Sequence, residues 1–246
     1  MRRIITNNGQ IGVTLAVTIV SILLSVIITF SILTLAGVSE ELYRISLIIS
    51  IIAPATIAPL VTWYLVKLLI KVHDLEQQQR RLATYDGLTG ALNRRAFFES
   101  FEAIKQQIEK AQTDLTLAYI DLDDFKPIND LYGHVVGDKV LKSFVATLRD
   151  ELRSTDIIAR VGGEEFVIIL PNTEINDAQS SLDRIRTKIA ETPLTIEDHC
   201  INLSVSIGLS QNKRDHSLII DQLIQEADKA LYKAKEAGKN CIVQYA

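Results

Sequence analysis

The sequence contains few of the residues that build disulfide scaffolds or cysteine metal sites. Its 246 residues include only two cysteines, Cys200 and Cys241, with one methionine and one tryptophan. Two cysteines do not form a disulfide framework or a zinc knuckle. We therefore interpret both as reduced thiols in a cytosolic domain.

Charge is scarce at the start of the chain and mostly acidic in the remainder. Residues 1–66 carry only three arginines and two glutamates, whereas residues 84–246 carry 19 Lys or Arg against 26 Asp or Glu, a net charge of −7. An acidic domain of this kind lacks the clustered cations that neutralise DNA or RNA phosphates. The composition argues against nucleic acid as a partner.

Two long uncharged runs dominate the first 66 residues. One covers the 26 residues 11–36 and the other the 22 residues 45–66, and roughly 20 apolar residues suffice to cross a bilayer as a helix. Residues 1–66 are therefore predicted to form a transmembrane hairpin with spans at about 11–36 and 45–66. A cleaved signal peptide fits less well, because the first run is too long and a second follows at once. Pro54 and Pro59 predict a kink in the second span.

The cations that flank the spans predict their orientation. Only Arg44 lies between the spans, whereas the other flanking cations precede the first span or follow the second: Arg2, Arg3, Lys67, Lys71, Arg80 and Arg81. The positive-inside rule then places both termini in the cytoplasm. The outer connection, residues 37–44, is too short to fold into a ligand-binding domain.

A helical connector is expected at residues 67–84. Apolar residues and one glutamine repeat there at spacings of four, three, four and three, at Leu68, Val72, Leu75, Gln79 and Leu82. This pattern is typical of the seam of a parallel coiled coil, here about two heptads long. The alternative is a monomeric helical stalk that continues from the membrane.

Residues 85–246 alternate between strand-like and helix-like segments, which predicts a layered α and β domain. Strands are expected at 115–121, at 157–170 as two strands joined at Gly162 and Gly163, at 201–208, and at 241–245 as an edge strand. Helices are expected at 94–111, 137–152, 176–191 and 217–237.

Acidic residues gather at three places in this domain. Asp121, Asp123 and Asp124 end the first strand, Asp130 and Asp138 flank a glycine-containing segment, and Glu164 and Glu165 follow the Gly-Gly turn. Carboxylates at a strand end and on a hairpin tip could hold Mg²⁺, whose remaining ligands are commonly substrate phosphates. Glycine at the turn permits a close backbone approach to a ligand.

Five ordered motifs in this domain resemble the GGDEF family of diguanylate cyclases. They are DGLTGALNRR at 86–95, DLDDFKPIND at 121–130, GHVVGD at 133–138, GGEEF at 162–166 and ADKALYKAKEAGKN at 227–240. The resemblance implies an α/β fold similar to nucleotidyl cyclases, with a central, mostly antiparallel sheet surrounded by helices. It also implies the condensation of two GTP into cyclic di-GMP with release of two pyrophosphates.

The same resemblance implies roles for individual residues. Asp121, the carbonyl of Leu122 and Glu164 would bind Mg²⁺ or Mn²⁺, consistent with metal-assisted phosphoryl transfer. Asn129 and Asp138 would bind the guanine, and His134 would contact the ribose or the base unless it is only a structural turn residue.

Cations would neutralise the phosphates, with Lys126 at the transferring group and Lys235 and Lys239 at the terminal phosphates. The family commonly has arginine at the position of Lys239, so a bidentate contact is lost there. Glu164 or Glu165 would help deprotonate the attacking 3′-hydroxyl.

Two further expectations follow from the resemblance. Arg153 and Asp156 match the family's RxxD product-inhibition site, to which Arg160 could add, although an exposed ion pair is the alternative. Because each domain binds one GTP and the product needs two, the enzyme would act as a homodimer.

The protein would lie in the bacterial inner membrane and act in signal transduction, in a family that usually controls biofilm formation and motility. The alternatives are a non-catalytic cyclic di-GMP receptor, a module that signals through protein contacts, and a cyclase that uses another nucleotide.

Overall fold

The computed structural model describes residues 7–212 and 219–245. The chain divides into two compact units, Met1–Gln79 and Arg80–Ala246.

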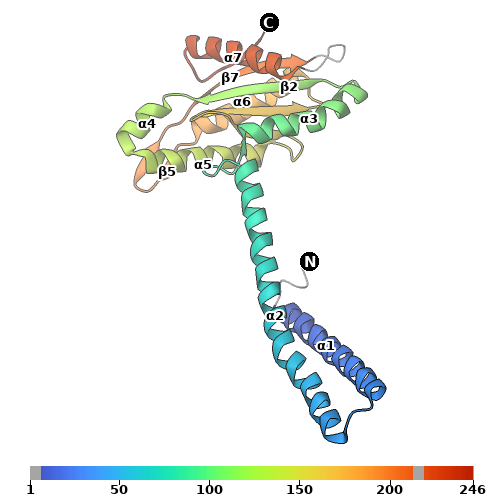
Figure 1. Ribbon diagram of the computed structural model, residues 1–246. Coiled ribbons are helices and arrows are strands. Elements are labelled where there is room, and N and C mark those ends of the chain that lie inside the picture. The colour runs from blue at the N-terminus through green and yellow to red at the C-terminus, as the bar shows by residue number, and fades with distance from the viewer. Residues whose placement is uncertain (1–6, 213–218, 246) are drawn as a thin grey trace. The chain divides into compact units, whose positions relative to one another are not determined.

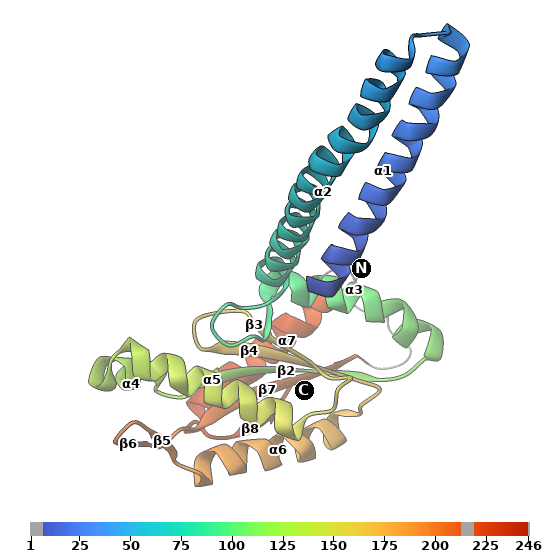
Figure 2. The same cartoon turned by 90° about the horizontal axis from the view of Figure 1, so that it is seen from below.

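The first unit is a hairpin of two long helices. Helix α1 spans Asn7–Ala36 and helix α2 begins at Glu40 and continues to Thr84, and the two lie side by side (Figure 2). Only Gly37–Ser39 separate them, and the predicted outer connection at 37–44 would include this turn and the first residues of α2. Helix α2 continues through Pro54 and Pro59; a kink at these prolines stays a prediction.

Both helices are long and apolar enough to cross a membrane. None of the most apolar window of α1 is buried within the protein, and only 11% of that of α2 is. A core helix of a soluble protein would instead be mostly buried. The apolar side chains of this hairpin therefore lack a protein core to cover them, as expected for a surface that contacts lipid.

The second unit is built on a six-stranded sheet with the order β1-β3-β4-β2-β7-β8. The three inner pairings are antiparallel and the two edge pairings, β1 with β3 and β7 with β8, are parallel. The strands are β1 (Leu92–Asn93), β2 (Leu115–Leu122), β3 (Ile157–Arg160), β4 (Glu165–Pro171), β7 (Val205–Asn212) and β8 (Ile242–Gln244), with a separate hairpin of β5 (Leu194–Ile196) and β6 (His199–Ile201).

Helices cover both faces of this sheet. Helix α7 (Ile220–Glu236) lies on one face, and α5 (His134–Glu151) and α6 (Ile175–Glu191) lie on the other (Figure 1). The first face buries Phe97 and Phe101 of α3 (Arg94–Ala111) against Leu117 of β2. The second buries Phe144 of α5, whose ring meets that of Phe166 on β4 at 4.9 Å. The mixed α/β fold expected from the sequence is thus confirmed.

Most predicted elements agree with the structure, and the differences have physical reasons. The strand expected at 201–208 is wrong in its boundaries: β6 ends at Ile201 and β7 begins at Val205. Ile201 and Leu203 are both buried, which extends the apolar alternation beyond the strand. The short helix α4 (Phe125–Tyr132) was not expected, and α5 begins three residues early, at His134. The predicted start of the last helix at 217 lies outside the described residues.

Candidate nucleotide and metal site

The sheet register brings two of the predicted acidic clusters together. Asp121 near the end of β2 is the cross-strand partner of Glu165, the first residue of β4. The amide of Leu122 donates to the carbonyl oxygen of Glu164 at 3.3 Å. Because neighbouring strands lie about 5 Å apart, the β3–β4 turn places its carboxylates beside the end of β2.

The carboxylates at this edge have perturbed proton affinities. Burial raises the pKa of Asp121, while the hydrogen bond from Lys235, whose Nζ lies 2.8 Å from Oδ2, opposes the rise. Burial and the charge of Asp121 also raise the pKa of Glu164. Mutual repulsion of nearby carboxylates is relieved by a cation placed between them.

The donor chemistry of this edge fits a hard divalent ion. Two carboxylates and the carbonyl of Leu122 are all oxygen ligands, as Mg²⁺ prefers. Among residues 7–212 and 219–245, no three His, Cys, Asp or Glu side chains form a metal cage of their own. An ion here would therefore complete its coordination with water or substrate oxygens, which suits a nucleotide substrate.

The turn residue Gly162 makes room for the side chain of Glu165. A Cβ at Gly162 would lie only 2.1 Å from Oε2 of Glu165, so any larger residue would displace that carboxylate. Arg160 fixes the same turn by donating from Nε and Nη2 to the carbonyl of Gly163, at 3.1 and 2.6 Å.

The residues expected to bind guanine come from two consecutive helices. Asn129 lies on α4 and Asp138 in the first turns of α5, and Gly133, with φ +82°, makes the turn between the helices. A Cβ at Gly137 would lie 1.8 Å from Oδ1 of Asn129, so the Asn129 side chain packs against α5 at Gly137, the residue before Asp138. His134 is exposed at the start of α5.

Two of the three predicted phosphate-binding cations, Lys235 and Lys239, contact carboxylates at the same edge. Lys235 lies on the last turn of α7 and contacts Asp121, and Lys239 follows the helix, with Nζ 2.6 Å from Oδ1 of Asp124. The hydrogen bond to Asp124 raises the pKa of Lys239, which keeps its charge. Lys126 is exposed on α4.

The RxxD residues, Arg153 and Asp156, line a cavity. It measures about 400 Å³ and is bordered by Arg149, Arg153, Asp156 and the β1 segment. The backbone amide of Arg153 donates to Asp156 at 2.8 Å, and within the described residues no ion pair joins their side chains. Burial raises the pKa of Asp156, against the hydrogen bond from the Arg153 backbone.

The expectation that Arg160 adds to the RxxD surface is wrong. Its side chain is only 15% exposed, and Nη1 lies 3.1 Å from Oδ1 of Asp86 while the rest of the guanidinium binds the β3–β4 turn. Position 160 faces this turn because it is the last residue of β3 and pairs with Phe166.

Asp86 is a residue to which the sequence had assigned no role. Its Oδ1 accepts hydrogen bonds from the amide and the hydroxyl of Thr89, at 2.8 and 2.6 Å, and from Arg160. Aspartate and glycine are both typical turn residues, so Asp86 and Gly87 could have identified the turn but not its long-range partner.

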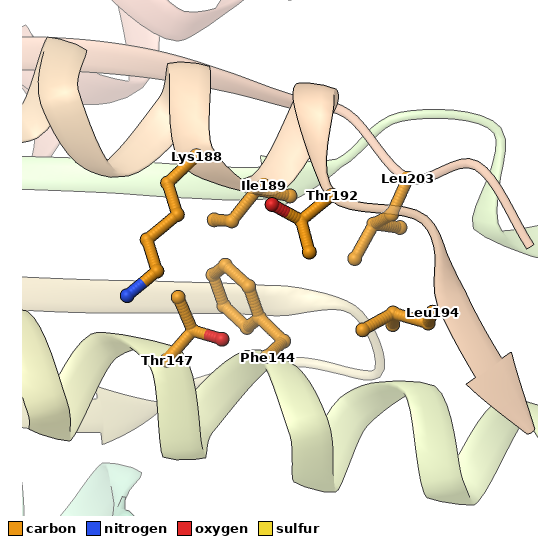
Figure 3. Close-up of a pocket in the computed structure, with 7 residues that line it drawn as sticks. All are labelled: Phe144, Thr147, Lys188, Ile189, Thr192, Leu194 and Leu203. Carbon is orange, nitrogen blue, oxygen red and sulfur yellow. The ribbon is translucent and has the colours of Figure 1, made fainter.

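A smaller cavity lies outside the proposed nucleotide site. It lies between α5 and α6, is lined mostly by Phe144, Ile189, Leu194 and Leu203, and measures only about 50 Å³ (Figure 3). Small-molecule sites usually enclose roughly 300 Å³ or more, so this space is a packing defect.

Comparison with known proteins identifies the family. The profile described as "Diguanylate cyclase, GGDEF domain" matches residues 83–241. The diguanylate cyclase DgcP of Pseudomonas aeruginosa is 39% identical over 168 residues, which cover 68% of this chain and 25% of that protein. DgcM of Escherichia coli is 39% identical over 178 residues, which cover 70% of this chain and 42% of that protein. The chain thus matches less than half the length of these relatives.

Solved structures agree with these sequence matches. The coiled coil and GGDEF domain of DgcB from Caulobacter crescentus, solved in complex with c-di-GMP, has a TM-score of 0.66 and 29% identity, covering 72% of this chain and 94% of that one. The active GGEEF domain of a diguanylate cyclase from Vibrio cholerae has a TM-score of 0.57 and 34% identity, covering 63% and 97%. The matched region contains all five motifs and the β2–β4 edge, and the chain therefore belongs to the GGDEF family of diguanylate cyclases.

Proposed function

We propose that this protein is a membrane-bound diguanylate cyclase that condenses two GTP into cyclic di-GMP and two pyrophosphates. The observation that carries the proposal is the β2–β4 register, which brings Asp121, the Leu122 carbonyl and Glu164 to one edge. The contacts of Lys235 with Asp121 and of Lys239 with Asp124 support the proposal, because they bring two candidate phosphate-binding lysines to the same carboxylates.

The nucleotide would be held at three points. Asp138 would accept the N1 and N2 donors of guanine, which adenine does not offer, with Asn129 beside it. Lys235 and Lys239 would bind the terminal phosphates and Lys126 the transferring one. The carboxylates of Asp121 and Glu164 would hold a divalent ion, Mg²⁺ by preference, which when bound polarises the phosphate. His134 is exposed at the mouth of the α4–α5 turn and would contact the ribose or base.

Proton transfer would fall to the β3–β4 turn. Glu165 lies opposite Asp121 in the sheet, and the absence of a side chain at Gly162 leaves room for it. Burial and the negative charge of Asp121 both raise the pKa of Glu164. We assign Glu164 mainly to metal binding and Glu165 to the base that accepts the 3′-hydroxyl proton. The resulting alkoxide attacks the α-phosphorus of the other GTP, and pyrophosphate leaves.

Two domains must meet to complete the reaction, since each holds one GTP. The seam of the connector supports pairing through α2, because Leu68, Val72, Leu75 and Leu82 are each at least 45% exposed. Exposed apolar residues at heptad spacing are stabilised by a second identical helix. We therefore propose a homodimer joined along residues 67–84, between a hairpin at 1–66 and a catalytic domain at 85–246.

Product inhibition would act at Arg153 and Asp156. Their cavity of about 400 Å³ lies within the usual range of ligand sites, and a guanidinium suits both phosphates and guanine. The hairpin would anchor the dimer in the inner membrane of a bacterium, with both termini in the cytoplasm.

The test is to incubate the full chain, in detergent or vesicles, with GTP and Mg²⁺. We expect cyclic di-GMP and pyrophosphate in a ratio of one to two, no turnover of ATP alone, and little effect of excess ATP. A folded dimer that produces none would overturn the proposal. If it nevertheless binds cyclic di-GMP, the RxxD cavity would instead support a receptor.

A further inference from the structure

The loop after α7 adopts a backbone conformation that requires support. Lys239 and Asn240 have φ values of 65° and 45°, in the left-handed region that non-glycine residues rarely adopt. Two such residues in succession persist only when neighbouring groups hold them. This loop matters because Lys239 belongs to it and Lys235 lies in the last turn of the helix before it.

Asn240 is held through three of its polar atoms. Its amide donates to Oδ2 of Asp123 at 3.0 Å. Nη1 of Arg186 donates to its carbonyl oxygen at 3.1 Å and to its side-chain oxygen at 2.9 Å. Asp123 follows β2 and Arg186 lies on α6, so two separate elements fix one residue of the loop.

Asp123 is committed to this structural role. The residue is only 6% exposed, and its two carboxylate oxygens accept from the hydroxyls of Ser204 and Ser206, at 2.8 and 2.7 Å, in addition to Asn240. Hydrogen bonds to an ionised carboxylate are stronger than neutral ones. Asp123 therefore differs from Asp121, two residues earlier, whose carboxylate contacts a lysine.

Arg186 is placed to use its planar guanidinium. Its side chain is 19% exposed, and a further contact to Asp183 at 2.8 Å orients it. Nη1 donates to both oxygens of Asn240 while Nε and Nη2 contact Asp183. A guanidinium presents several donors in a fixed plane and can bind two residues at once, which an ammonium group does less well.

We propose that Asp123 and Arg186 are positioning residues that clamp Asn240 and thereby set Lys235 and Lys239 for the terminal phosphates of GTP. The clamp holds the loop against the end of β2, where the two lysines contact Asp121 and Asp124. The inference rests on the proposed cyclase function and deepens it. It predicts that loss of the clamp weakens binding of the triphosphate but not of the guanine.

The experiment compares two ligands on the full chain in detergent with Mg²⁺. 3′-Deoxy-GTP lacks the attacking hydroxyl and cannot cyclise, and 3′-deoxy-GMP lacks the terminal phosphates as well. Calorimetry gives both dissociation constants for the unchanged protein and for Asp123→Asn, Arg186→Ala and Arg186→Lys. The control is Arg184→Ala, on the same helix, whose side chain is 65% exposed and pairs with Glu151.

We expect Asp123→Asn and Arg186→Ala to weaken 3′-deoxy-GTP binding about tenfold, the effect of losing one charge-assisted hydrogen bond. Binding of 3′-deoxy-GMP should stay within about twofold, Arg186→Lys should recover part of the loss, and Arg184→Ala should change neither ligand. If Asp123→Asn does not fold, as judged by circular dichroism, the two Arg186 variants decide.

Equal weakening of both ligands, or unchanged binding of 3′-deoxy-GTP, would overturn the positioning role. If the unchanged protein binds neither ligand, the proposed function fails and this inference fails with it. Normal binding by the unchanged protein together with equal effects on both ligands refutes the clamp alone.

Discussion

At the scale of single residues, neighbouring carboxylates in one short motif have different environments. Asp121 contacts Lys235, Asp123 accepts three hydrogen bonds, and Asp124 pairs with Lys239. Burial raises the pKa of Asp121. Chemical identity alone therefore does not assign a role here, because solvation and partners decide what each carboxylate can bind.

The proposed base can be tested by a substitution that preserves shape. Glu165→Gln should lower cyclic di-GMP formation by about a hundredfold or more, since a carboxamide cannot accept the 3′-hydroxyl proton. The thermal unfolding midpoint should not change, because the side chain keeps its volume. Product is measured by chromatography, with Glu191→Gln, at the exposed end of α6, as control. Turnover close to that of the unchanged protein would refute the assignment.

The product site makes an independent prediction. Arg153→Ala should leave the initial rate of turnover unchanged but raise the concentration of added cyclic di-GMP needed for half inhibition by about tenfold or more, because a charged donor is lost. Rates are measured over a range of added product, with Arg184→Ala as control. Inhibition that is unaltered by the substitution would show that Arg153 does not bind the product.

Sequence motifs identified the residues proposed for the nucleotide site, but not their supporting contacts. The Gly-Gly turn and the acids beside it are local in sequence, so Glu164 and Glu165 were identified directly. Arg186 binds Asn240 across 54 residues, and Asp86 binds Arg160 across 74. Such pairs depend on how helices pack on the sheet, which no local pattern encodes.

At the scale of secondary structure, local patterns located helix α3 better than strand β7. The predicted helix 94–111 matches α3 at both ends, because Asn93 caps it by accepting from the amide of Ala96 at 2.9 Å. For β7, the apolar alternation continued through Leu203, which is buried but belongs to neither β6 nor β7. The alternation of apolar residues along the sequence indicates which side chains are buried. The first residue of a strand is instead defined by its hydrogen bonds to the neighbouring strand.

The contact between Asp86 and Arg160 ties the segment before β1 to strand β3, and it predicts a pH-dependent stability. Burial alone would raise the pKa of Asp86, but hydrogen bonds from Thr89 and Arg160 outweigh it and hold the pKa below its ordinary value. A group with a lowered pKa in the folded state stabilises the fold above its unfolded pKa, and that contribution is lost as the pH falls through the folded pKa.

Asp86→Asn should therefore lower the free energy of unfolding by about 1–2 kcal/mol at pH 7, or about 3–6 °C in unfolding midpoint. Below about pH 4 the difference from the unchanged protein should shrink, since Asp86 becomes protonated. Circular dichroism of the full chain in detergent gives the midpoints, with the exposed Asp150→Asn as control. A difference that does not depend on pH would contradict the charged role of Asp86.

At the scale of the whole molecule, the proposed reaction would require two chains, and the connector predicts how they would pair. Leu75→Asp would place a charge in the seam, where its desolvation opposes helix pairing. We expect a shift from dimer to monomer by light scattering in detergent and a loss of turnover of about tenfold or more, restored in part at high protein concentration.

Gln77→Asp introduces the same charge two residues away, at an exposed position off the seam, and should preserve the dimer. If both variants remain dimeric and active, pairing does not depend on this seam. If the unchanged protein is a monomer with full activity, the dimeric mechanism itself is wrong.

Helix α2 runs without interruption from Glu40 to Thr84, and this continuity limits how the gene can change in evolution. Deleting one codon within the connector shortens the helix by about 1.5 Å and turns everything beyond it by about 100°. Natural variation in connector length should therefore favour steps of about seven residues, which preserve the phase of the seam. Recombination that exchanges the helical hairpin for another N-terminal module should preserve function only when it keeps the same phase of the connector helix.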